Sequence, residues 1–280
     1  MMRIDAHQHF WLMSAREGQW PPASLAAIYR DFQPQDLMPL LKQTGIDGTV
    51  VVQSLPVEAD TDYLLTLASQ HDFILGVVGW VDLTHADAPA RIRQFAGHPA
   101  FKGVRPMLQS EADDHWICQP GLAPAINALM ESKLSFDALV LPRQLPGLLR
   151  FAREYPALPI VIDHAAKPEI ALQQWDEWAA DMTALAACPN VFCKLSGLLT
   201  EAGIYTDTRH LAPYVDLVLQ QFGAHRVMWG SDWPVLNLAG QYAGWVDQSE
   251  ALLAQLTSTE KQAVFGGTAS EFYRLAHRGV

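Results

Sequence analysis

Cysteine is scarce in this 280-residue sequence, which contains only Cys118, Cys188 and Cys193. They form neither a Cys-x-x-Cys pair nor an even-numbered framework, so a disulfide-stapled fold is excluded and we expect reduced thiols in a cytoplasmic protein. The sequence also has no run of 18 apolar residues and no basic-then-apolar segment at its start. We therefore expect neither a transmembrane helix nor a secretory signal.

Basic residues are in the minority as well, because 19 Lys and Arg face 30 Asp and Glu and give a net charge of −11. This balance argues against non-specific binding to nucleic acid or to an anionic membrane. No linker rich in Gly or Ser, no charge block and no short repeat divides the chain, and 50% of its residues are hydrophobic. We predict one globular domain over residues 1–280.

Apolar, β-branched runs recur along the whole chain and predict eight strands, at residues 4–9, 48–54, 74–82, 101–107, 134–140, 160–164, 191–196 and 226–232. Helical spacing of apolar residues separates them. One such pattern stops at Gly45, and Thr257 with Glu260 resembles a capping box that opens the last helix. Strands that alternate with helices predict a parallel sheet, and eight units in this length favour an α/β fold, the (β/α)8 or TIM barrel.

The first predicted strand carries His7 and His9 in "IDAHQHFW". Successive side chains of a strand point to opposite faces, so these two imidazoles share a face. Most of the other predicted strands also end in or near a polar residue, namely Asp82, Arg105, Asp137, His164, Lys194 and Asp232. Singly, each has an ordinary structural explanation. Together they predict an active site, because the C-terminal ends of barrel strands converge.

Tryptophans accompany these polar strand ends. Trp11, Trp80 and Trp233 lie close to them in sequence, and we expect them to wall a small-molecule pocket. The least regular stretches, 14–33, 110–119 and 237–244, each follow a predicted strand. We therefore expect these loops to cover the same end of the barrel and to decide which substrate enters.

Six motifs together resemble the amidohydrolase superfamily: "DAHQHFW", "VGWVDL", "KGVRPMLQ", "DHAAKP", "CKLSGLLTEA" and "WGSDWPV". The His-x-His pair alone marks only the superfamily. The combination of "KGVR", "HAAKP" and "KLSG" resembles its branch of sugar-acid lactonases, typified by L-fuconolactonase and L-rhamnonolactonase. The resemblance extends from residue 4 to about residue 275 and implies a (β/α)8 barrel and a carbohydrate-metabolising hydrolase.

The resemblance also implies site residues, because His7, His9, His164 and Asp232 match the positions that surround the reacting carbonyl in this family. The fifth predicted strand offers Asp137 but no His, and the fourth offers Arg105 where a bridging Lys or Glu is expected. A binuclear metal site is therefore not expected. One divalent ion, best Zn²⁺, is compatible with His7, His9 and Asp232, with His164 as a further ligand. The resemblance itself favours catalysis without a required metal.

These residues support a mechanism for opening an aldonolactone such as L-fucono- or L-rhamnonolactone. Asp232 is predicted to be the general base on water, while the three histidines hydrogen-bond the carbonyl and the oxyanion. The predicted substrate-binding residues are the basic Arg105, Lys167 and Lys194 and the aromatic Trp11, Trp80 and Trp233.

Three alternatives stay open at this point. A metal-dependent decarboxylase of the same superfamily would need tightly bound metal. A lactonase for an aromatic-pathway dicarboxylate would need more arginines around the pocket, and only Arg143 and Arg209 join Arg105 as candidates. The third is a barrel that binds a sugar acid or a partner without turnover. The sequence does not indicate which lactone is used or the oligomeric state.

Overall fold

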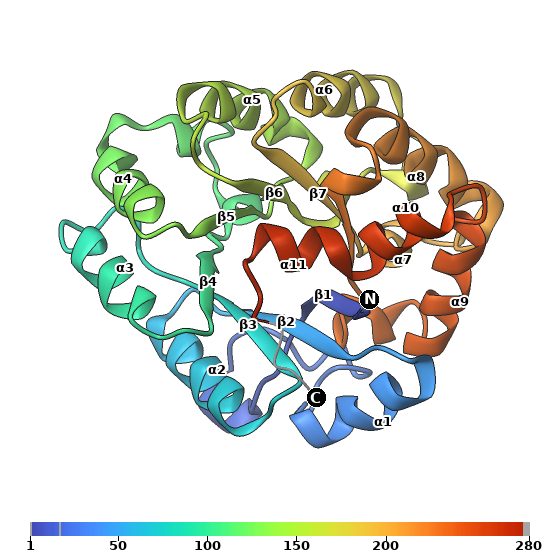
Figure 1. The fold of residues 1–280 in the computed structure, drawn as a ribbon, viewed down its shortest axis with the longest axis horizontal. Coiled ribbons are helices and arrows are strands. Elements are labelled where there is room, and N and C mark those ends of the chain that lie inside the picture. The colour runs from blue at the N-terminus through green and yellow to red at the C-terminus, as the bar shows by residue number, and fades with distance from the viewer. Residues whose placement is uncertain (1, 17, 277–280) are drawn as a thin grey trace.

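The computed structural model describes residues 2–16 and 18–276, and its eight parallel strands form one nearly closed barrel in sequence order (Figure 1). The strands are β1 (Ile4–Gln8), β2 (Gly48–Val52), β3 (Ile74–Gly79), β4 (Phe101–Val104), β5 (Ser135–Ala138), β6 (Ile160–Ile162), β7 (Val191–Leu195) and β8 (Val227–Trp229). All eight predicted strands and the TIM-barrel fold are confirmed. Each strand ends one to three residues earlier than predicted. Arg105, His164 and Asp232 lie in the loops beyond their strands, whereas Asp137 and Lys194 stay within β5 and β7.

Helices surround the barrel (Figure 1). They are α1 (Pro34–Thr44), α2 (Glu58–Gln70), α3 (Ala88–Ala96), α4 (Ala123–Glu131), α5 (Leu145–Glu154), α6 (Asp176–Ala186), α7 (Leu198–Glu201), α8 (Thr208–Phe222), α9 (Tyr242–Leu252), α10 (Ser258–Gln262) and α11 (Thr268–Phe272). Two predicted signals are confirmed. Gly45 ends α1 with φ of 66°, a left-handed conformation that suits glycine, and Thr257 with Glu260 forms the capping box of α10.

The apolar core has two parts. The larger part lies between the sheet and the helices, and the smaller one fills one end of the barrel interior with strand residues such as Ile4 and Val161. Helix α11 and the residue after it add Phe272 and Tyr273 to this inner cluster. Because α11 lies across this end of the barrel (Figure 1), the end at which the strands finish is the one left for a site.

The first and last strands are joined beyond β8. The backbone N–H of His9 donates to Trp233 at 2.7 Å, and that of Asp232 donates to His7 at 2.8 Å. The buried Asp5 carboxylate accepts from the backbone of His7 and of Ser231, so it braces both strands. Barrel closure thus brings the His-x-His pair against Asp232. Among the described residues, no helix has the length and apolarity needed to cross a lipid bilayer.

Candidate active site

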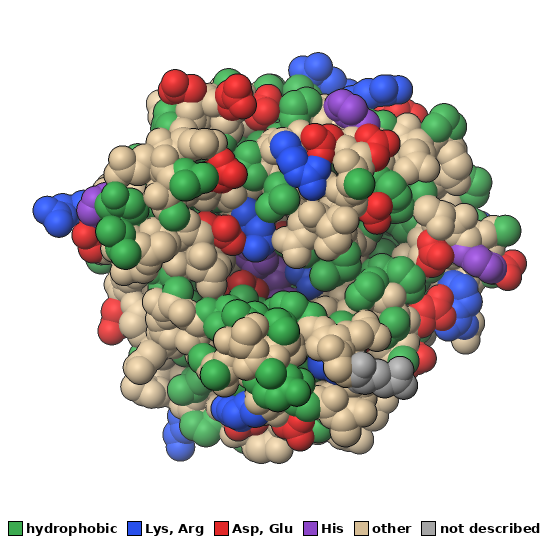
Figure 2. Space-filling view, turned by 180° about the vertical axis from the view of Figure 1, so that it is seen from behind, with side chains coloured by type: hydrophobic (Ala, Val, Ile, Leu, Met, Phe, Trp, Pro, Cys, Tyr) green, Lys and Arg blue, Asp and Glu red, His purple; other side chains and the backbone are tan. Residues whose placement is uncertain are grey.

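A cavity of about 740 Å³ opens at the C-terminal ends of the strands. Figure 2 looks onto this end of the barrel and shows a hollow with histidine and basic side chains at its floor. The three irregular loops reach its wall as expected: the first contributes Gln19, Trp20 and Leu25, the second Ser110, Glu111 and Trp116, and the third Leu238.

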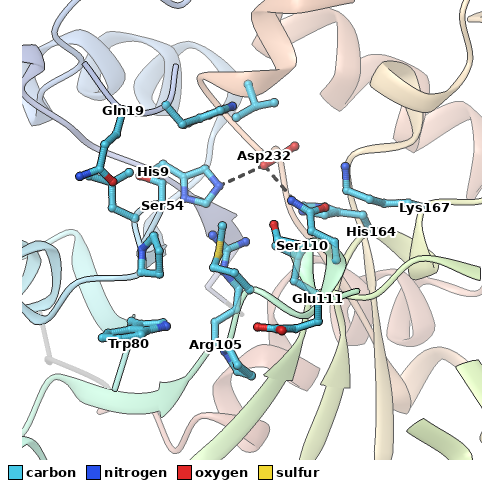
Figure 3. Close-up of a pocket in the computed structure, with 18 of the residues that line it drawn as sticks. His9, Gln19, Ser54, Trp80, Arg105, Ser110, Glu111, His164, Lys167 and Asp232 are labelled. Carbon is cyan, nitrogen blue, oxygen red and sulfur yellow. Dashed lines mark hydrogen bonds and ion pairs between the residues drawn. The ribbon is translucent and has the colours of Figure 1, made fainter. Parts of the chain in front are cut away.

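Oδ1 of Asp232 is faced by the Nε2 atoms of three histidines. The distances are 3.2 Å to His9, 3.7 Å to His7 and 3.8 Å to His164. His7 and His9 come from the end of β1, His164 follows β6 and Asp232 follows β8, so three strands build one cluster. Figure 3 shows His9, His164 and Asp232 beside one another. Oδ2 of Asp232 accepts no hydrogen bond from any residue that the structure describes, and the side chain lines the cavity.

Burial decides the charges in this cluster. It lowers the pKa of His164 to about 4 against the opposing effect of Asp232, and it lowers the pKa of His7 well below the usual value. Burial raises the pKa of Asp232, but His164, His9 and His7 lower it by more, so the net pKa lies well below the usual range. At neutral pH an ionised carboxylate therefore stands beside uncharged His7 and His164.

The proton of His9 is placed by its second contact. Nδ1 of His9 lies 2.7 Å from the carbonyl oxygen of Val52, which only accepts, so Nδ1 carries the proton. In the neutral ring Nε2 is then a bare lone pair, and it faces the Asp232 carboxylate at 3.2 Å. Two acceptors at this distance repel each other unless a proton or a metal ion lies between them.

The loop backbone at the site is strained. His164 has φ of 54°, the next three residues through Lys167 are also left-handed, and Asp232 has φ of 58°. Such conformations cost on the order of 1–3 kcal/mol for residues other than glycine and cluster at functional sites. A Cβ on Gly197 would lie 2.6 Å from Nδ1 of His164, so the glycine of "KLSG" makes room for the imidazole, and the hydroxyl of Ser196 lies 2.9 Å from the same nitrogen.

A network of buried charges lies beneath the histidines. Nζ of Lys194 is 2.7 Å from Asp137, 3.0 Å from Asp163 and 3.1 Å from Nδ1 of His7. Arg105 adds a second cation at 3.5 Å from Asp163. Burial raises the pKa of Asp163, but Lys194, His7 and Arg105 lower it by more and hold it well below the usual range. Two cations and two carboxylates therefore compensate one another inside the barrel.

One of two candidate donor groups suits a metal ion. The groups are His7, His9 and Asp232, and His7, Asp163 and His164, each with its ligand atoms within 4.8 Å of one another. In the first group Nε2 of His7 is buried without a hydrogen-bond partner, and Nε2 of His9 presents a lone pair. Imidazole nitrogen and carboxylate oxygen are Zn²⁺ ligands, so this group fits. In the second, the ammonium of Lys194 already contacts Asp163.

Three of the predicted substrate-binding residues line the cavity, namely Arg105, Lys167 and Trp80. Arg105 is 3% exposed and also donates to the carbonyl oxygen of Gln53. Lys167 forms an ion pair with Glu201 at 2.8 Å. Figure 3 shows Trp80 and Lys167 on opposite sides of the cavity, with Asp232 between their two sides.

Lys194, Trp11 and Trp233 do not line the cavity, which corrects the prediction that they face the substrate. Lys194 is fully buried in the charge network. Trp11 and Trp233 are buried and pack edge-on against Phe32 at centroid distances of 5.3 and 5.2 Å. His7 is also buried and lies beside Asp232 rather than at the wall. Nearness in sequence to a polar strand end does not decide which way a side chain in a loop turns.

Several side chains of the site were not singled out from the sequence. Asp163 had a usable signal, because a carboxylate next to His164 interrupts an apolar strand in "IVIDH". Ser54, Glu111 and Gln19 line the cavity, but they lie in irregular loops whose conformation no periodic pattern predicts.

The chain belongs to the amidohydrolase family, whose model matches residues 4–275. A curated relative from Burkholderia ambifaria, an L-fucono-1,5-lactonase, is 56% identical over 277 residues, covering 98% of this chain and 96% of that protein. An L-fucono-1,5-lactonase from Burkholderia multivorans is 36% identical over 290 residues, with 98% and 96% covered.

Among solved structures, an amidohydrolase from Burkholderia multivorans with bound Zn superposes with a TM-score of 0.92 and 35% identity, covering 99% of this chain and 100% of that one. The expected family and fold are therefore confirmed.

Proposed function

We propose that this protein is a lactonase that opens the lactone ring of a sugar acid, with an aldonolactone such as L-fucono-1,5-lactone as substrate. One observation carries the proposal: an ionised carboxylate, Asp232, has a free oxygen at the floor of a polar cavity and is ringed by three imidazoles. The names of the two curated relatives support the same reaction. A low cysteine content supports a cytoplasmic enzyme.

Asp232 is the general base. Its Oδ1 is held among the histidines, whereas Oδ2 accepts nothing from the described residues and is positioned to take a proton from water at the lactone carbonyl. The same proton then passes to the ring oxygen as the acyl C–O bond breaks. A lactone is an activated ester, so this step needs less electrophilic help than an amide would.

Charge on the carbonyl oxygen is stabilised by side chains that line the cavity. His164 and the guanidinium of Arg105 line the cavity and can donate to this oxygen. His9 can donate only when its Nε2 is protonated, because Nδ1 is already bonded to the Val52 carbonyl. Losing one such donor typically costs about 2.7–4 kcal/mol of transition-state stabilisation. His7 is buried, so we assign it to holding Asp232 rather than to touching the substrate.

His7, His9 and Asp232 would hold a single divalent ion, best Zn²⁺. His164 lies outside this group, although its Nε2 is 3.8 Å from Oδ1 of Asp232. Bound there, the ion supplies Lewis acidity toward the carbonyl and lowers the pKa of bound water. The lone pair of His9 Nε2 and the unpartnered Nε2 of His7 support this assignment, as does the Zn-bound structural relative.

The charges of the cavity favour a neutral lactone over a dicarboxylate. Its cations, Arg105 and Lys167, are each paired with an acid, at 3.5 Å and 2.8 Å. Asp82 and Glu111 add negative charge to the wall. A second carboxylate on the substrate would therefore meet repulsion rather than a free cation.

The arginines that a dicarboxylate lactonase needs lie elsewhere. Arg143 pairs with Asp114, and the Arg209 side chain is 88% exposed beside Asp207. Neither lines the cavity. The decarboxylase alternative is disfavoured too, because the two curated relatives named above are both lactonases.

Acid release from a panel of lactones tests the proposal. The panel contains neutral aldonolactones, L-fucono- and L-rhamnonolactone among them, and matched lactones that carry a second carboxylate. Turnover of neutral members with at least tenfold preference over carboxylated ones is expected. Absence of turnover on every lactone, together with CO₂ release from an aromatic acid, would support the decarboxylase instead.

A further inference from the structure

Ser54 contributes a side chain to the cavity wall that the reaction described above does not use. It follows β2, is 5% exposed, and lines the cavity on the same side as Gln19 (Figure 3). Lys167 lies on the opposite side (Figure 3). What distinguishes Ser54 from other polar residues of the wall is how firmly both its backbone and its hydroxyl are held.

Arg16 fixes the direction of the Ser54 hydroxyl. Nη2 of Arg16 lies 2.5 Å from Oγ of Ser54. A guanidinium has donors and no acceptor, so Oγ must be the acceptor in this bond. The hydroxyl hydrogen of Ser54 then points away from Arg16, and the described residues offer it no acceptor within hydrogen-bond distance. Since Ser54 lines the cavity, the remaining direction for this hydrogen is toward a bound ligand.

The backbone of Ser54 is fixed from the other side. Asp60, near the start of α2, accepts from the backbone N–H groups of Ser54 and Leu55 at 2.8 and 3.1 Å. Its second oxygen lies 3.6 Å from Arg16, so the carboxylate compensates the buried guanidinium. Ser54 is therefore clamped between a buried cation and a buried anion.

Arg16 also ties the first irregular loop to this clamp. Nη1 of Arg16 donates to the carbonyl oxygen of Trp20 at 2.9 Å, and its guanidinium lies 4.9 Å from the centroid of the Trp11 ring. Trp20 lines the cavity beside Leu25. One buried side chain thus sets the position of two parts of the wall, the loop that carries Trp20 and the hydroxyl of Ser54.

We propose that Ser54 is a specificity-determining donor that binds a hydroxyl of the sugar lactone, and that Arg16 is the positioning residue that aims it. The proposal rests on the lactonase function proposed above. A substrate hydroxyl does not change during ring opening, so a bond to it acts on the ground state and the transition state alike and affects KM rather than kcat. A neutral hydrogen bond of this kind corresponds to about a threefold to tenfold change in affinity.

The test compares Ser54→Ala with the wild type on the preferred lactone and on its deoxy analogues, each lacking one hydroxyl. We expect Ser54→Ala to raise KM for the parent lactone about threefold to tenfold with kcat within twofold. For the deoxy analogue that lacks the hydroxyl bound by Ser54, the KM values of the variant and the wild type should be the same. Ser69→Ala is the matched control, because it removes a serine hydroxyl that bonds to Leu65 on the outer helix α2.

The role of Arg16 is tested by Arg16→Lys, which keeps the charge but loses the planar fork. If Arg16 acts through Ser54, the double variant Ser54→Ala/Arg16→Lys has the same KM as the worse single variant. If the increase in KM of the double variant is instead the product of the increases in the two single variants, the positioning role of Arg16 is overturned.

Wild-type turnover is measured first. An inactive wild type means that the lactonase function is wrong and this inference with it. An active wild type whose Ser54→Ala variant keeps KM within twofold on every lactone overturns the inference alone.

Discussion

Nζ of Lys194 lies 3.1 Å from Nδ1 of His7, and neither side chain is exposed. His7 belongs to both candidate metal-binding groups, and the second group also needs Asp163, which the same ammonium contacts at 3.0 Å. A metal ion bound by His7, Asp163 and His164 would be repelled by the buried ammonium of Lys194 next to it. The lysine thus leaves His7, His9 and Asp232 as the group open to a cation.

The first prediction concerns metal content. Protein saturated with Zn²⁺ and then dialysed is expected to retain one ion per chain, and His9→Ala should lower the affinity for that ion at least tenfold. Elemental analysis and competition with a chelator measure both quantities. His85→Ala, which alters a histidine with a 64% exposed side chain, is the control. Two tightly held ions per chain, or unchanged affinity in His9→Ala, would contradict the assignment.

The second prediction concerns Asp232. Asp232→Asn keeps the size of the side chain but removes the base, so kcat should fall about 10²–10⁴-fold. Steady-state kinetics measure kcat, and a melting curve for each variant shows whether a decrease in kcat is caused by unfolding. Asp181→Asn, which changes a partly buried aspartate of α6 outside the cavity, should leave kcat unchanged. A decrease of less than tenfold in Asp232→Asn would remove Asp232 from the role of base.

The sequence predicted the barrel well because its signals are periodic and repeated. Eight apolar runs, each ending near a polar residue, allow few arrangements other than a closed parallel sheet, and the structure has all eight strands. His9, His164 and Asp232 were predictable for the same reason. They lie at strand ends, whose convergence follows from the topology alone.

Side-chain direction was less predictable. Trp11 and Trp233 turn into the core because Phe32 offers them an aromatic surface, and that contact depends on a loop conformation that no periodicity encodes. Lys194 lies beneath the site because Asp137 and Asp163 meet it inside the barrel. The sequence showed the charges but not their pairing across strands.

The third prediction concerns the buried charge network. Lys194→Met leaves Asp137 and Asp163 without their shared cation, so the free energy of unfolding should fall by about 3–5 kcal/mol. Denaturant unfolding followed by circular dichroism measures it. The matched control is Arg93→Met, which breaks the exposed pair with Glu131 and should cost about 0–1 kcal/mol. Equal losses in the two variants would mean that the network does not hold the barrel together.

The last prediction concerns stability at alkaline pH. Tyr273 donates to Asp137 at 2.6 Å inside the barrel, and burial raises the pKa of its phenol well above the usual value of 10. A raised pKa in the folded state means that the contribution to stability is complete below pH 10 and is lost as pH rises above it, because only the unfolded chain then releases the proton. The slope from this one group is about 1.4 kcal/mol per pH unit.

Tyr273→Phe should therefore be less stable than the wild type at pH 8, by about 1 kcal/mol for the lost hydrogen bond, and should lose stability less steeply between pH 10 and 11. Unfolding in urea at several pH values gives the two curves. Tyr29→Phe, which removes a hydroxyl from a side chain that is 46% exposed, is the control for the general alkaline loss. Parallel curves for Tyr273→Phe and the wild type would show that the phenol ionises at the same pH in the folded and unfolded states, which would contradict the prediction.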